Sequence, residues 1–176
     1  MTRTPRKLAL ASILALAALA GCSTTSGTGP RVSQSGFDGA RIVTINPHGN
    51  ACKSMTCTGL GAQWSSKNPT ESVLVVSLFN EVKAIVGAQI NIDGKVYDLS
   101  NAQPFTNFSD FGAATKESRK GFIVPTDLIR KIAASQRTWL RVTTTAGNFE
   151  DAVVDGQADS KAFHALRRFL ASVDQD

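Results

Sequence analysis

The feature that most constrains the fold is an Asp-Gly pair between two stretches of β-forming residues. Residues 84–92 and 95–99 flank Asp93-Gly94. A two-residue type I′ turn needs positive φ at both central positions, which Asp-Gly tolerates, so the pair predicts a β-hairpin. The expected opposite pairs are Ile92 and Lys95, Ile90 and Tyr97, and Ala88 and Leu99 on one face, with Gln89 and Asp98, and Asn91 and Val96, on the other. One face is therefore largely apolar and is expected to be buried.

Six further stretches are rich in β-forming residues and are bounded by turn signals. They are Ala40–Ile45, Gly59–Ser65, Ser72–Phe79, Gly121–Val124, Thr138–Thr145 and Phe149–Val154. Ser72–Phe79 is apolar at both odd and even positions, which predicts a central strand covered on both faces. Trp139, Arg141 and Thr143 share one face of their strand. Residues 46–50, Asn-Pro-His-Gly-Asn, predict a turn, and the charged residues 116–120 are expected to be solvated.

Two helices are expected late in the chain. Thr126 is a candidate N-cap for a helix that ends near Ser135 and buries Leu128, Ile129, Ile132 and Ala133. Asp159 or Ser160 precedes a helix from Lys161 to about Val173, whose apolar residues repeat at helical spacing. Its other side carries Lys161, His164, Arg167 and Arg168. We interpret that side as solvated; the alternative is contact with anionic lipid headgroups.

These elements predict a mainly β (α+β) fold over residues 37–176 as a single domain. Its expected architecture is an antiparallel sheet or sandwich of seven to eight strands, with two helices packed on it near the C-terminus.

The N-terminal residues have the pattern of an export signal. Arg3, Arg6 and Lys7 precede an apolar run from Leu8 to Ala20. A run of about 13 residues is too short to cross a bilayer, which needs about 20, but it suits the core of a secretory signal. Without this leader the chain has 16 basic and 14 acidic residues, so its basicity gives little support for a nucleic-acid partner, and none is expected.

The leader ends in Leu19-Ala20-Gly21-Cys22. This sequence resembles the lipobox of bacterial lipoproteins. The resemblance implies cleavage between Gly21 and Cys22, a diacylglyceryl group on the thiol of Cys22 and an acyl group on its freed amine. Two or three chains anchor a protein stably in a membrane. Ser23 at the next position implies, by the same resemblance, transfer to the outer membrane. Residues 23–36, rich in Ser, Thr and Gly, predict a flexible tether.

Cys52 and Cys57 are the other cysteines. In an oxidising compartment such a pair predicts a disulfide. A metal site with His48 would have only three ligands at an unusual spacing. A catalytic redox pair would normally be Cys-x-x-Cys. We therefore expect a structural disulfide, no metal and no cofactor.

Phe105, Phe108 and Phe111 lie in a polar stretch before Gly112. We interpret these rings as covering one end of the core, since large aromatic residues dominate cores in small domains. The alternative is that they contact a partner.

No phosphate-binding loop, nucleophile elbow or zinc-protease motif occurs in the sequence. A Ser–His–Asp site assembled from distant residues would need His48 or His164 as its base. Two hypotheses therefore remain. One is a non-catalytic envelope module, facing the periplasm, that binds another envelope protein or a cell-wall component through a sheet face or the Phe105–Phe111 segment. The other is an envelope hydrolase whose site is not recognisable from sequence.

The order of elements from Ala84 to Leu170 resembles the invasion-associated locus B family of exported proteobacterial proteins. The residues that carry this resemblance are Ile92-Asp93-Gly94, Val124-Pro125 with Leu128-Ile129, Arg141-Val142, and Ala165-Leu166 with Phe169-Leu170. That family usually has cysteines between the hairpin and the first helix, where this chain has Phe111-Gly112-Ala113-Ala114. No site residue is carried over from it.

Overall fold

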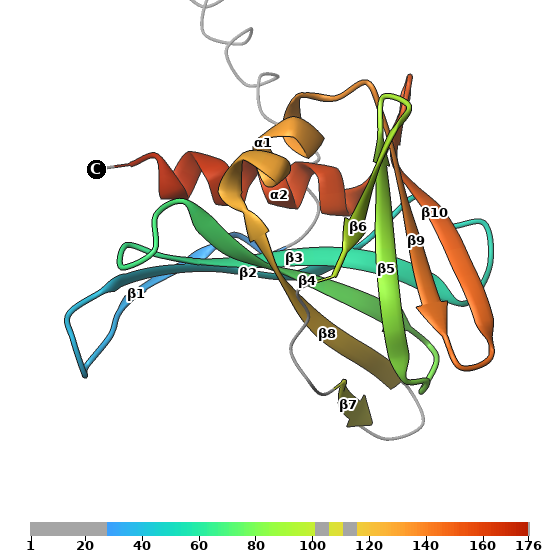
Figure 1. Cartoon of the computed structure of the whole chain (residues 1–176), viewed down its shortest axis with the longest axis horizontal. Coiled ribbons are helices and arrows are strands. Elements are labelled where there is room, and N and C mark those ends of the chain that lie inside the picture. Colours follow the sequence, from blue (N-terminus) through green and yellow to red (C-terminus); the bar gives the residue numbers. More distant parts are fainter. Residues whose placement is uncertain (1–27, 101–105, 111–115, 176) are drawn as a thin grey trace, which may run out of the picture.

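The β-forming stretches assemble into two antiparallel sheets (Figure 1). The structure is a computed structural model that describes residues 28–100, 106–110 and 116–175. The strands are β1 (Arg31–Gln34), β2 (Arg41–Gly49), β3 (Cys57–Ser65), β4 (Glu71–Phe79), β5 (Ile85–Ile92), β6 (Lys95–Leu99), β7 (Asn107–Asp110), β8 (Lys116–Pro125), β9 (Arg137–Thr144), β10 (Gly147–Asp155) and β11 (Ala158–Asp159). The helices are α1 (Thr126–Ala134) and α2 (Lys161–Val173).

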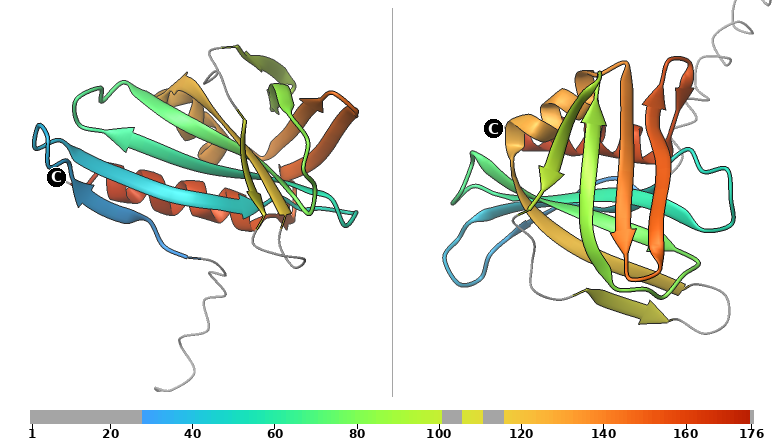
Figure 2. Two further views of the ribbon diagram at one scale, coloured as in Figure 1. Left: turned by 90° about the horizontal axis from the view of Figure 1, so that it is seen from below. Right: turned by 45° about the vertical axis from the view of Figure 1, so that its right-hand side comes forward.

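The six-stranded sheet has the order β1-β2-β3-β4-β8-β7, and the five-stranded sheet has the order β11-β10-β9-β5-β6. Helix α2 lies along β2 and β3 of the six-stranded sheet, and α1 packs against α2. The strands of the five-stranded sheet run across those of the six-stranded sheet (Figure 2). They cover the end of the six-stranded sheet that the helices leave free. Both sheets and both helices contribute to one apolar core.

The mainly β class with two late helices is confirmed, but the described residues form eleven strands rather than seven or eight. The sequence prediction lacks β1, β7 and β11. Strand β1 is at a sheet edge and all four of its residues are exposed, so it carries no alternation of apolar and polar residues. Strand β11 has only two residues. Because β1 pairs with β2 from Arg31, the sheet begins inside the stretch assigned to the tether.

The β5–β6 hairpin has the predicted register in all five pairs, from Ala88 opposite Leu99 to Ile92 opposite Lys95. Asp93 and Gly94 have φ of 48° and 92°, as the type I′ turn requires. Strand β4 lies between β3 and β8, which confirms that it is a central strand. One face of β4 is buried, whereas Val73 and Val75 on the other face are only half-buried.

Two predicted irregular stretches are instead parts of strands. Strand β2 continues through the expected turn at 46–50, with a register shift between Ile45 and His48. The bulge accommodates Pro47, which has no N–H for a sheet ladder. The charged stretch 116–120 begins β8, where Glu117 and Ser118 are buried between β4 and β7. The carboxylate of Glu117 has a partner there, because Arg119 Nη2 donates a hydrogen bond to it at 2.6 Å.

The helix ends differ in how they are capped. Ser160 Oγ accepts a hydrogen bond from Phe163 N, so Ser160 caps α2. Thr126 is the first residue of α1 rather than its cap, and its hydroxyl lies 2.9 Å from Ser72 Oγ on β4. The two helices are joined by Arg130, which donates two hydrogen bonds to Asp174. This contact lowers the pKa of Asp174 and raises that of Arg130.

Candidate binding face on the five-stranded sheet

The outward face of the five-stranded sheet carries a row of paired polar side chains. Alternation along β9 buries Leu140 and Val142 and points Trp139 and Arg141 away from the core. Directly opposite Arg141 are Gln89 on β5 and Glu150 on β10, and opposite Gln89 is Asp98 on β6. We call Asp98, Gln89, Arg141 and Glu150 the polar rung.

Hydrogen bonds run along the whole polar rung. Gln89 Nε2 donates to Asp98 Oδ1 at 2.6 Å, and Arg141 Nη1 donates to Gln89 Oε1 at 3.2 Å. Arg141 also donates from Nε to Glu150 Oε1. Gln89 therefore accepts from one neighbour and donates to the other, which fixes the orientation of its amide. These hydrogen bonds connect outward side chains of four adjacent strands: β6, β5, β9 and β10.

Trp139 lies beside the polar rung on β9. Its cross-strand neighbours are Asn91 and Ala152. Its indole Nε1 donates to Asp155 Oδ2 at 3.0 Å, and the same carboxylate pairs with Arg137 at 3.4 Å. The indole ring is held by this bond and is only partly exposed. A fixed aromatic ring of this kind offers a large apolar surface at little entropic cost.

A shallow hollow of about 210 Å³ lies over this face, lined by residues of β5, β6, β9 and β10 and of the β5–β6 turn. It brings together the indole of Trp139, the exposed side chain of Val96 and three members of the polar rung: Gln89, Arg141 and Glu150. Every acidic or basic side chain named on this face already has an oppositely charged or amide partner. The face therefore offers apolar area and hydrogen-bonding groups, and its named charged side chains, three acidic and two basic, all have partners.

The sequence predicted part of this face. The pairing of Gln89 with Asp98 and the shared face of Trp139 and Arg141 both follow from alternation, and both are observed. The contact between Gln89 and Arg141 was missed because it depends on β5 pairing with β9. No local signal in the sequence specifies that long-range pairing.

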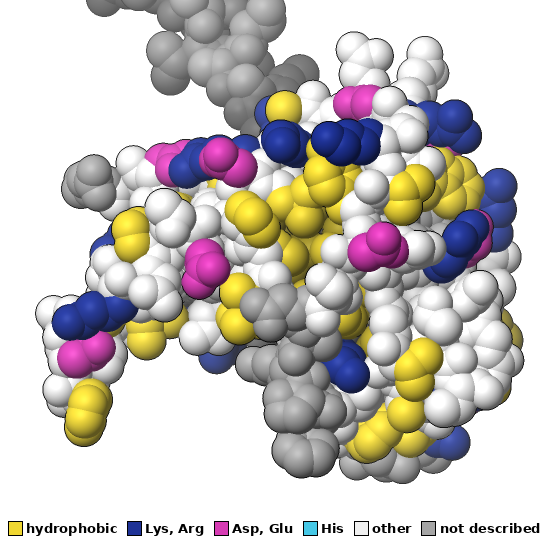
Figure 3. Space-filling model, in the orientation of Figure 1, with side chains coloured by type: hydrophobic (Ala, Val, Ile, Leu, Met, Phe, Trp, Pro, Cys, Tyr) yellow, Lys and Arg dark blue, Asp and Glu magenta, His cyan; other side chains and the backbone are white. Residues whose placement is uncertain are grey.

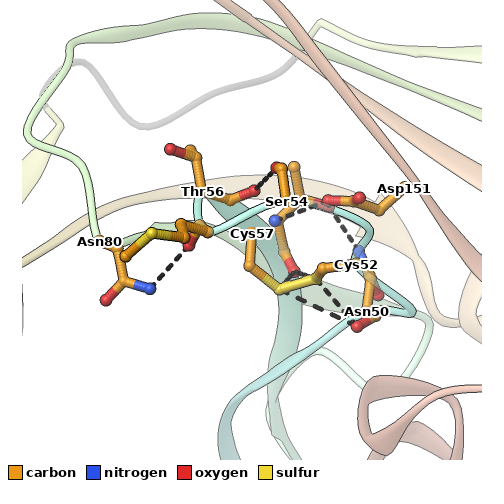
Figure 4. The surroundings of a disulfide bond; sticks show 9 residues. Asn50, Cys52, Ser54, Thr56, Cys57, Asn80 and Asp151 are labelled. Carbon is orange, nitrogen blue, oxygen red and sulfur yellow. Dashed lines mark hydrogen bonds between the residues drawn. A yellow bond between two sulfur atoms is a disulfide. The ribbon is translucent and has the colours of Figure 1, made fainter.

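Cys52 and Cys57 lie at disulfide-bonding distance, as predicted, with their Cα atoms 5.4 Å apart. Their loop joins β2 to β3 and covers a buried polar cluster (Figure 4). In that cluster, Asp151 Oδ2 on β10 accepts hydrogen bonds from the backbone N–H and the hydroxyl of Thr58 on β3, both at 2.8 Å. Asn50 Nδ2 donates to Thr58 Oγ1 at 2.9 Å. The cluster therefore connects the two sheets.

The two sulfurs and a carboxylate oxygen of Asp151 lie within 4.8 Å of one another. His48, the third ligand considered from the sequence, is not part of this group. It is buried on β2, where its Nδ1 donates to Asn46 O at 2.7 Å. With both sulfurs in a disulfide, neither provides a thiolate for a metal.

The histidines are held by contacts other than those of a catalytic triad. His164 Nε2 lies 2.7 Å from Asp159 Oδ2 at the start of α2. Among the hydrogen bonds of the described residues, neither histidine has a serine hydroxyl as its partner. Arg167 stacks over the ring of Phe163, with its guanidinium carbon 5.7 Å from the ring centroid.

Several predicted site residues lie outside the described part of the chain. Gly21 and Cys22 belong to the undescribed residues 1–27, and Phe105 and Phe111 belong to 101–105 and 111–115. Phe108 is described: it lies on β7 and is 53% exposed. In the described ranges, no helix is long and apolar enough to cross a bilayer.

Comparison with protein-family models, with curated proteins and with solved structures found no match. The resemblances to lipoprotein signals and to the invasion-associated locus B family therefore remain predictions from the sequence.

Proposed function

We propose that this protein is an envelope lipoprotein that binds a cell-wall glycan without catalysing a reaction. Its N-terminal Cys22 is acylated and anchors it in the outer membrane, facing the periplasm. The outward face of the five-stranded sheet is the ligand-binding surface. An envelope hydrolase stays the alternative: His164 has the carboxylate partner that a Ser–His–Asp site needs, but among the described residues neither histidine is bonded to a serine hydroxyl.

The observation that carries the ligand class is that every charged side chain named on that face already has a partner, around a fixed indole. A charged ligand would need an unpaired cation or anion, because breaking an existing pair costs most of what a new one gains. A neutral polyhydroxylated chain needs apolar area for its ring faces and hydrogen-bonding groups for its hydroxyls. Trp139 supplies the apolar area, and the polar rung supplies the hydrogen-bonding groups.

Binding to purified cell-wall sacculi tests the ligand class. The lipidated protein in mild detergent should co-sediment with sacculi, and Trp139→Ala should weaken binding by about tenfold or more, as loss of a central aromatic contact does. Thr143→Ala is the matched control, since Thr143 lies on the same strand and face but outside the hollow. Absence of binding by the parent protein would reject the glycan. Equal binding by both variants would reject this face.

Metabolic labelling with a radioactive fatty acid tests the anchor. Label should enter the parent protein and be absent from Cys22→Ser, because the thiol is the acceptor in lipoproteins of this type. The anchor also predicts that the parent, and not the variant, fractionates with membranes. Label that persists on Cys22→Ser would show that the acyl group is attached to another residue and would reject Cys22 as the anchor.

A further inference from the structure

The β1–β2 hairpin ends in a fully exposed aromatic side chain. Phe37, between the two strands, is 100% exposed, and Val32 on β1 is 54% exposed. Figure 3 shows hydrophobic surface at the free end of this hairpin, next to acidic and basic side chains. A fully exposed phenylalanine has no packing partner in the described part of the chain.

The hairpin end is well ordered by its own hydrogen bonds. Gly39 N donates to Ser35 O at 3.0 Å, and Ser35 N donates to Ala40 O at 2.8 Å. Ser35 Oγ accepts from the N–H groups of Phe37 and Asp38, and Asp38 Oδ1 accepts from Ala40 N at 3.1 Å. Because these backbone groups are already satisfied, inserting the ring of Phe37 at the level of the lipid headgroups leaves none of them without a partner.

The charges at the hairpin favour an anionic surface. The hydrogen bond from Ser35 is the main cause of the lowered pKa of Asp38, followed by the bond from Ala40, so this carboxylate is ionised at neutral pH. Lys67 lies 3.9 Å from it and balances its charge. Arg31, exposed at the other end of β1 opposite Thr44, then gives the hairpin as a whole a net positive charge. Anionic headgroups attract such a surface.

The length of chain before β1 limits how far the hairpin can be from the bilayer. Strand β1 begins at Arg31, nine residues after Cys22. Nine residues span about 30 Å when fully extended and about 15–18 Å when relaxed. An acyl group on Cys22 therefore keeps the start of β1 within that distance of the lipid, and Phe37, six residues farther along the chain, at most about 20 Å beyond it.

We propose that the β1–β2 hairpin docks on the membrane surface, with Phe37 inserted at the level of the lipid headgroups. This inference rests on the proposed lipid anchor. It adds an orientation: the domain lies with one end of the six-stranded sheet on the bilayer rather than rotating freely on its tether. The loop that holds Met55 joins the other end of β2, about 30 Å away along a nine-residue strand, and faces away from the lipid.

The experiment places a tryptophan at each end of the six-stranded sheet. The lipidated protein is reconstituted in vesicles of phosphatidylethanolamine and phosphatidylglycerol, as Phe37→Trp and as Met55→Trp. Met55 is the matched control because it is also highly exposed, at 87%. The emission of the added tryptophan, taken as the difference from the parent protein, should shift to shorter wavelength and be quenched by brominated lipid only in Phe37→Trp.

The outcomes separate the hairpin from the anchor. Mass spectrometry of the same sample measures the acyl groups on Cys22, so their absence rejects the anchor directly. If Cys22 is acylated and both tryptophans emit as in water, the hairpin proposal is wrong while the anchor stands. If the emission of Phe37→Trp shifts in detergent without lipid and depends on protein concentration, a second copy of the chain covers the hairpin, and the membrane proposal is also wrong.

Discussion

Asp151 is a buried carboxylate whose hydrogen bonds cross from one sheet to the other. Only 7% of its surface is exposed, and Thr58, which donates both of its hydrogen bonds, is 0% exposed. Burial of a charge without partners is costly, so these two bonds are necessary for Asp151 to lie where it does. Removing the carboxylate would leave two donors of Thr58 without an acceptor.

Asp151→Ala should therefore lower the free energy of unfolding by about 1–3 kcal/mol, the cost of leaving buried donors unsatisfied. The control is Glu150→Ala on the neighbouring outward-facing residue, whose exposed ion pair with Arg141 contributes at most about 1 kcal/mol. Urea denaturation of both variants measures the difference. Equal losses would show that the contact between the sheets contributes no more than a surface pair does.

For single residues, the number of cysteines and the alternation along strands predict more than the recognised motifs do. The pairing of Cys52 with Cys57 follows from the number of cysteines and from the oxidising compartment that the N-terminal pattern predicts. Asp151 was missed, although it alternates with Phe149 and Val153 on β10 and so occupies an inward position. A charged residue at an inward position indicates a buried polar cluster. Its partner Thr58 is 93 positions away and has no sequence signal of its own.

Among the elements, β2 at its bulge lies too close to β3 for a side chain at Gly61. A Cβ atom on Gly61 of β3 would lie 2.6 Å from both Ile45 O and Pro47 N. These are backbone atoms on either side of the register shift, so neither can move without displacing β2. The absence of a side chain at Gly61 allows the bulge and the neighbouring strand to approach this closely.

Gly61→Ala should cost about 1–3 kcal/mol of stability through overpacking. Gly87→Ala on β5 is the matched control, because no atom lies within 4 Å of its Cβ position, and its effect should stay within about 0.5 kcal/mol. Thermal unfolding followed by circular dichroism would measure both. Similar melting temperatures for the two variants would mean that the backbone of β2 can shift at the bulge at little energetic cost.

Local patterns predicted the elements well where one face is buried and the other is exposed. The β5–β6 hairpin and α2 are of this kind, and both match their expected residues. Strand β1 does not carry that pattern because all four of its residues are exposed, so the sequence predicts a tether there. Pro47 was taken as the end of a strand because a bulge and a turn share the same local signal.

For the whole molecule, the path of the chain couples the two sheets. The chain forms β1–β4, leaves for β5 and β6 in the second sheet, returns for β7 and β8, and then completes the second sheet with β9–β11. Neither sheet is built from one continuous segment, and both share one core. The molecule should consequently unfold as one cooperative unit.

The two tryptophans of the chain provide a probe of each sheet. Trp64 lies on β3 and Trp139 on β9. In Trp64→Phe and in Trp139→Phe, the remaining tryptophan should report the same urea midpoint as far-ultraviolet circular dichroism. A fluorescence midpoint that differs from the circular dichroism midpoint in either variant would show that the sheets unfold separately.

This path of the chain could not be predicted from the sequence. Alternation identifies a strand and its buried face, but the pairing of β4 with β8 and of β5 with β9 depends on packing between residues far apart in the chain. The candidate binding face depends on the second of these pairings. The residues of that face could thus be assigned to outward positions, but not to one another.

The same topology has a consequence for how fast the protein folds. The β5–β6 hairpin can form locally, but β5 has no neighbour on its other side until Thr138–Thr144 is in place. Sheets that depend on such distant pairings fold in about milliseconds to seconds, because loop closure precedes the contacts that offset its entropy. During that interval the free edge of β5, with Val86 more than half exposed even in the folded state, is open to other chains. The completion of the five-stranded sheet by β9 is therefore the step at which this chain becomes protected from aggregation.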